Sequence, residues 1–152
     1  MKYEFSINRT QYHVDGAIIT SAKFMCLVQI KMKPPLLDLP VEAKLDTAAA
    51  ITVLPKHIWK DADIIFPSSV TPSFNELKTL KGPVSGKIGF IEMTILTHTS
   101  KEDPLIKVPA FLAENDSEAS SYIVLGNAGF LEKYLIHIDQ RKNQNIAFID
   151  DN

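Results

Sequence analysis

Asp46 is the residue in this chain best placed for chemistry. It follows the apolar run at residues 41–45 and precedes Thr47 and three alanines. An ionised carboxylate in apolar surroundings is costly to bury without partners, and small neighbours leave room for another group to approach it. The same residues also fit a helix N-cap, because Asp before alanines is a common helix start. On composition alone the N-cap interpretation is favoured.

The other reactive residue types form no recognisable site. Cys26 is the single cysteine, so it has no disulfide partner, and its apolar neighbours predict a buried, inert thiol. The serine of residues 82–86, GPVSG, is one place off the spacing of a nucleophile elbow. Four histidines are scattered without metal-ligand spacing: His13, His57, His98 and His137. The sequence therefore predicts no metal and no cofactor.

Residues 45–55, LDTAAAITVLP, resemble the active-site loop of retropepsin-like aspartic proteases, the retroviral-type, single-lobe family. The family pattern is an apolar pair, Asp, Thr or Ser, Gly and Ala, followed by an apolar strand. The resemblance implies that Asp46 is catalytic and that Thr47 braces the loop across a two-fold axis. Ala48 stands at the glycine position of the pattern, where its Cβ would lie near the carboxylates or a bound peptide.

Two further segments extend this resemblance. Residues 122–131, YIVLGNAGFL, resemble the family's apolar-apolar-Gly-Asn segment, which implies that Leu125 and Gly126 lie in a strand beneath the aspartate loop. Residues 77–89 contain three glycines and occupy the place of the family's flap, a hairpin over the substrate. From the residues alone, an ordinary surface hairpin fits this segment equally well. The residues implied to bind substrate are Ala49, Ala50, Thr79, Gly82 and Gly86.

The chemistry of this family needs two carboxylates that share one proton, because like charges so close together do not both ionise. The chain holds one matching motif. Residues 116–118 come nearest to a second, but Glu118 replaces the small residue. The resemblance therefore implies a homodimer that hydrolyses peptide bonds with Asp46 from each subunit. Two alternatives stay open: a non-catalytic peptide-binding or assembly module with the same fold, and a domain cut from a longer protein.

Most segments that would position these residues have the pattern of strands. Apolar alternation and β-branched residues predict a mostly-β fold. Proline at residue 55 and Asn127 suggest short helices at 55–61 and 128–134, and polar residues 140–145 suggest the turn of a hairpin spanning 135–149. With the resemblance, this implies a closed, β-barrel-like acid-protease half with one or two short helices. The predicted strands are 3–7, 23–32, 41–45, 51–54, 87–97, 105–112 and 122–125.

Length and composition fit a single domain over residues 1–152. About 45% of the residues are hydrophobic and 22% are charged, with a formal net charge of −2. This balance carries no electrostatic footprint for nucleic acid. The sequence shows neither a signal peptide at its start nor an apolar stretch long enough to span a membrane. We therefore expect a cytoplasmic protein whose partners are a peptide substrate and a second copy of itself.

Overall fold

The computed structural model describes residues 5–32, 41–68, 75–79, 81–95, 105–117, 120–139 and 146–151. Across these residues the fold is mostly β, as predicted, with one helical turn, α1 (Lys56–Trp59), and a 3-10 turn, η3 (Leu131–Lys133). No helix in this part of the chain is long and apolar enough to cross a membrane. The strands are β1 (Phe5–Val14), β2 (Ala17–Met32), β3 (Val41–Leu45), β4 (Thr52–Leu54), β5 (Glu76–Thr79), β6 (Gly82–Ile95), β7 (Ile106–Ala113), β8 (Ile123–Leu125), β9 (Tyr134–Asp139) and β10 (Ile146–Asp151).

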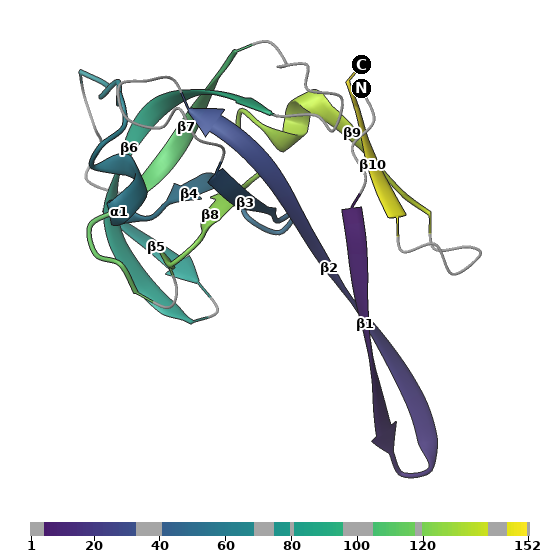
Figure 1. Ribbon diagram of the computed structural model, residues 1–152. Coiled ribbons are helices and arrows are strands. Elements are labelled where there is room, and N and C mark those ends of the chain that lie inside the picture. Colours follow the sequence, from purple (N-terminus) through teal and green to yellow (C-terminus); the bar gives the residue numbers. More distant parts are fainter. Residues whose placement is uncertain are drawn as a thin grey trace.

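The strands form one curled sheet with the order β5-β6-β7-β4-β8-β3-β2-β1-β10-β9. An additional pairing of β2 with β6, from Ile30↔Ile95 to Met32↔Met93, closes six of these strands into a ring. Figure 1 shows this curled body with α1 on its outside. The predicted barrel-like, mostly-β fold is therefore confirmed.

The ring encloses an apolar core. Strand β4 is buried at all three positions, and the second half of β7 is buried on both faces, as strands with neighbours on both sides require. The side chains of Leu54, Leu112, Leu125 and Phe130 are fully buried in one cluster. The core thus lies directly behind β3 and β4, the strands that lead into and out of the Asp46 segment, and behind β8, which pairs with both.

Both predicted helices are shorter than expected. Pro55 is the N-cap of α1 rather than its first helical residue, and the helix ends after a single turn. Residues 128–134 contain only η3. The predicted C-terminal hairpin is present as β9 paired with β10, and its expected turn at 140–145 lies outside the described residues.

The largest departure from the sequence prediction is the hairpin of β1 and β2. Strands were expected only at 3–7 and 23–32, but the two strands pair without interruption from Ser6↔Met25 to Val14↔Ala17. Asp15 and Gly16 form the turn with φ of 49° and 79°, the backbone of a type I′ hairpin turn. Residues 7–25, called the arm below, project from the body in Figure 1.

Candidate active site

Asp46 begins a tight turn at the end of β3. Its backbone N–H donates to the Leu125 carbonyl at 3.1 Å, and the Ala49 N–H donates back to the Asp46 carbonyl at 3.1 Å. Within the turn, the Ala48 N–H donates to Asp46 Oδ1 at 2.9 Å. The chain then enters β4 instead of a helix, so the N-cap interpretation is wrong. The side chain of Asp46 is exposed, and its carboxylate is oriented by a backbone donor of its own loop.

The exit of β8 holds this loop in place. Strand β8 pairs with β3 in parallel and with β4 at Val53↔Val124, so it lies between the strands on either side of the loop. Beyond it, the Asn127 N–H donates to the Ala49 carbonyl at 2.8 Å, and the Ala128 N–H donates to the Ala50 carbonyl at 2.9 Å. The Asn127 side chain adds a bond from Nδ2 to the Thr47 carbonyl at 2.8 Å. Carbonyls along the loop therefore have fixed partners.

Gly126 lies where the two segments pass closest. A Cβ at this position would lie 2.4 Å from the Ile51 carbonyl carbon and oxygen and 2.9 Å from the Ala49 oxygen. These are backbone atoms that cannot move aside without shifting the loop. The Gly126 N–H also donates to the buried Thr52 Oγ1 at 3.3 Å. Leu125 and Gly126 thus lie directly against the Asp46 loop, and only glycine leaves the room that this packing needs.

Ala48 fits the loop without a glycine-only backbone. Among the described residues, Asp15 is the one non-glycine residue with positive φ, so Ala48 adopts an ordinary conformation. Its N–H still reaches the Asp46 carboxylate. The methyl group of Ala48 therefore needs no strained backbone in this loop.

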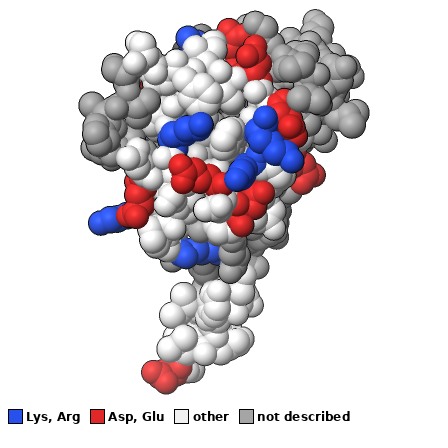
Figure 2. Space-filling view, turned by 90° about the vertical axis from the view of Figure 1, so that its left-hand side faces the viewer, with Lys and Arg blue, Asp and Glu red and all other residues white. Residues whose placement is uncertain are grey.

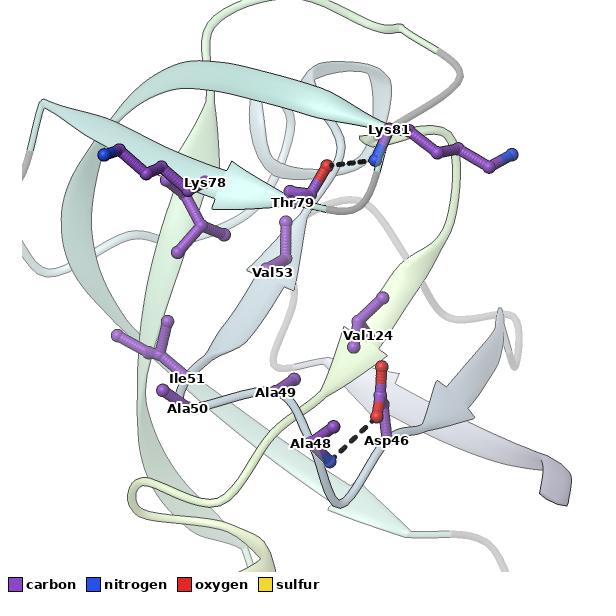
Figure 3. A pocket seen from close by; sticks show the side chains of 11 residues that line it. Asp46, Ala48, Ala49, Ala50, Ile51, Val53, Lys78, Thr79, Lys81 and Val124 are labelled. Atoms are coloured by element: carbon purple, nitrogen blue, oxygen red, sulfur yellow. Dashed lines mark hydrogen bonds between the residues drawn. The ribbon is translucent and has the colours of Figure 1, made fainter.

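A cavity of about 400 Å³ lies between the Asp46 loop and the turn of the β5–β6 hairpin. Figure 3 shows Asp46 and Ala48–Ala50 along one side, Thr79 and Lys81 facing them, and Val53 and Val124 between. Asp46, Ala48, Ala49, Ala50 and Thr79, all predicted from the sequence, therefore line one cavity. Its other lining residues, which the sequence analysis did not single out, are Ile51, Val53, Leu77, Lys78, Lys81 and Val124.

The predicted hairpin at 77–89 is present as β5 paired with β6. Thr79 Oγ1 donates to the Gly82 carbonyl at 2.7 Å and accepts from the Lys81 N–H at 3.2 Å, so its side chain pins the turn. Gly82, with φ of 114°, closes the turn but does not line the cavity. Gly86 does not line it either, because it is buried against Phe111 and the Leu112 carbonyl.

A second polar contact lies on the body away from the cavity. His57 Nδ1 lies 3.0 Å from Asp116 Oδ1, and the His57 N–H donates to the same oxygen at 3.2 Å. The side-chain hydrogen bond from His57 lowers the pKa of Asp116 below its ordinary value of 3.8. Both residues are exposed, so this pair ties α1 to the segment after β7. Within the described residues, no three His, Cys, Asp or Glu side chains gather to form a metal site.

No family model matches this chain, and no curated protein matches its sequence. Among solved structures, it is similar to a retropepsin-like aspartic protease from Rickettsia conorii. That similarity has a TM-score of 0.49 and 12% sequence identity, and it covers 98% of this chain and 89% of the other. The function proposed below therefore rests on the geometry of the Asp46 loop and its cavity.

Proposed function

We propose that this chain is one half of an aspartic endopeptidase, in which a homodimer brings together Asp46 from each subunit. One observation carries the proposal. The Asp46 carboxylate is exposed, is oriented by the Ala48 N–H, and lies at the side of a cavity lined mostly by alanine and aliphatic residues, together with Lys78, Thr79 and Lys81. A cavity of about 400 Å³ is within the size range of ligand sites.

The reaction needs a pair of carboxylates with one proton between them. The ionised member accepts a proton from a water molecule while the neutral member donates a hydrogen bond to the substrate carbonyl. The water oxygen attacks the carbonyl carbon, and the amine leaves once its nitrogen is protonated. A single chain supplies one carboxylate for these two tasks. The second Asp46 must therefore come from another copy.

The remaining site residues have supporting parts in this proposal. Thr47 and Ala48 shape the loop beside the second subunit, and Leu125 and Gly126 hold it from behind through the bonds described above. Ala49 and Ala50 leave space for an extended peptide backbone along the cavity. The Thr79 turn covers the peptide from the other side, and apolar Val53 and Val124 face its side chains. No metal or cofactor takes part.

A second function is favoured by one observation. Ala48 lines the cavity beside Asp46, where its methyl group occupies space close to the carboxylate. If this group keeps two Asp46 side chains apart, the same cavity holds a peptide without cleaving it. The chain would then be a peptide-binding or assembly module with the same fold.

The first test is Asp46→Asn. Asparagine keeps an oxygen for the Ala48 N–H, so the loop retains its shape while the titrating group is lost. We expect cleavage of an unfolded protein substrate to fall by about 10³-fold or more, the upper part of the range for acid–base groups. Asp61→Asn, an exposed carboxylate of the turn after α1, is the matched control and should leave the rate unchanged. Equal cleavage by wild type and Asp46→Asn would place the activity elsewhere.

The pH profile separates the two functions. A shared proton makes the rate fall on both sides of an acidic to mildly acidic optimum. A rate that climbs steadily into alkaline pH contradicts the aspartic mechanism. Absence of cleavage at every pH, together with equal peptide binding by wild type and Asp46→Asn, supports the binding module.

A further inference from the structure

The arm presents one apolar face to solvent. In an antiparallel pair, residues directly opposite share a face, and successive residues alternate between faces. The pairs Tyr12↔Ile19 and Val14↔Ala17 therefore lie on one face. The opposite face carries the more polar pairs Gln11↔Thr20 and His13↔Ile18. On the apolar face, Tyr12, Val14 and Ile19 are 53%, 48% and 52% exposed, which is unusual for a row of large apolar side chains.

Nothing in the described part of the chain covers this face. Apart from Met25, which pairs with Ser6, residues 7–25 pair only with one another there, and a two-stranded ribbon alone is marginally stable in water. Exposed strands usually carry charges that discourage association. Residues 10–20 hold no Lys or Arg and only one acidic residue, Asp15 in the turn. Figure 2 shows the projecting end of the arm as uncharged surface above an acidic tip. These features are those of a surface that is covered in the working protein.

The base of the arm, where β2 enters the body, lies next to the Asp46 loop. Strand β2 pairs with β3 up to Cys26↔Leu45, and Asp46 is the next residue after this pair. Because the strands are antiparallel, β3 runs out toward Asp46 in the same direction in which the arm leaves the body (Figure 1). The arm therefore extends past the point to which a second copy would bring its own Asp46.

The Asp46 loop by itself is too small to hold two subunits together. Its exposed residues are Asp46, Thr47, Ala48 and Ala50, all with short side chains. Stable interfaces bury about 1,200–2,000 Å² in total, with aromatic and large aliphatic residues at their centre. Tyr12, Val14 and Ile19 are residues of that kind, and they belong to the arm, whose strand β2 pairs with β3 next to the loop.

We propose that the arm is the dimerisation element of this protein. Its apolar face, formed by Tyr12, Val14, Ala17 and Ile19, packs against a second copy of the chain, whose own arm packs in return about the two-fold axis. This inference rests on the proposed function, because the need for a second Asp46 is what identifies the partner as another copy. It adds the surface that brings the two carboxylates together.

The test uses neighbouring residues on the two faces of the arm. Ile19→Glu places a charge in the proposed interface, whereas Thr20→Glu places the same charge on the opposite face, one residue farther from the turn. Sedimentation velocity over a range of concentrations measures the dimer dissociation constant of each. We expect Ile19→Glu to raise it by at least about tenfold and Thr20→Glu to change it by less than about twofold. Circular dichroism checks that both variants keep the wild-type β content.

A shortened arm gives an independent measurement. Removing residues 11–14 and 17–20 keeps the Asp15-Gly16 turn and joins it to Thr10 and Ser21, which already pair with each other and have the same place in the hydrogen-bonding alternation as Val14 and Ala17. This protein should keep the body fold and sediment as a monomer. A wild type that stays monomeric at high concentration, or a dimer that Ile19→Glu leaves intact, overturns the inference.

The same experiments separate this inference from the proposed function. A wild-type dimer that depends on Ile19 but cleaves no peptide supports the arm and overturns the peptidase assignment. Cleavage that requires Asp46, in a dimer indifferent to Ile19→Glu, supports the peptidase assignment and overturns the role of the arm.

Discussion

The Asp46 loop and the arm are both exposed, yet they are held in opposite ways. The loop receives hydrogen bonds from Asn127 and Ala128 and packs its backbone against Gly126, so distant parts of the chain fix its shape. Within the part of the chain that the structure describes, the arm is held by the pairing of its own two strands. A site that must present a carboxylate at a fixed point needs the first kind of support. A surface that is stabilised by a binding partner can be held by cross-strand pairing of its own residues.

The difference in support between the loop and the arm is tested most strongly by adding a methyl group to one glycine in each region and comparing the losses of stability. Gly126→Ala forces a Cβ against the backbone of residues 49–51, and we expect it to destabilise the fold by about 3 kcal/mol or more. Gly16→Ala has open space around it and meets only the strain of positive φ, about 1 kcal/mol, confined to the arm. Denaturant unfolding measures both. Equal losses of stability would show that the loop is no more tightly built than the arm.

A smaller effect is expected from the hydroxyl beneath the loop. Thr52→Val keeps the side-chain shape and removes the acceptor of the Gly126 N–H, which leaves a buried donor unpaired. The expected cost is about 1–3 kcal/mol in the free energy of unfolding. The matched control is Thr20→Val in the exposed arm, where we expect a change within about 0.5 kcal/mol. If the two variants unfold alike, the hydroxyl contributes nothing to the support of the loop.

The smallest effect concerns the surface pair His57 and Asp116. The folded pKa of Asp116 lies below 3.8, so its contact with His57 stabilises the fold above the unfolded value and is lost as pH falls through the folded one. Asp116→Asn should therefore lower the melting temperature slightly at neutral pH, with the difference vanishing under strongly acidic conditions. The effect is small because exposed pairs are screened by solvent. A difference that grows toward acid would contradict the assigned direction.

The sequence predicted the body of the fold well and missed the arm. Strand β4 and the second half of β7 have dense apolar runs because both of their faces are buried, and β3 alternates buried and less buried positions. Residues 8–22 mix polar and apolar positions without strict alternation, and residues 10–20 are exposed on both faces, so packing on the core does not impose a pattern on them. The Asp-Gly dipeptide at 15–16 was the available hairpin signal.

At the candidate site, the motif predicted which loop matters but not what supports it. Asp46 and its alanines were found from their local pattern. The contacts of Thr52 with Gly126 and of Asn127 with Thr47 span 74 and 80 residues, and no local pattern reports such pairings. Gly82 and Gly86 were expected at the cavity because glycines suit a mobile hairpin. In the structure one closes the turn and the other makes room for Phe111.

The long reach of those contacts also has a consequence for how the protein is made. On the ribosome, the Asp46 segment emerges long before the segment that holds it, since its partners Asn127 and Ala128 follow about 80 residues later. Proteins dominated by such non-local pairings fold slowly, because a large loop must close before any contact is gained. The Asp46 turn therefore takes its final shape only after synthesis passes residue 128. The two strands of the arm are close in sequence and pair around one tight turn, so the arm can form early in synthesis.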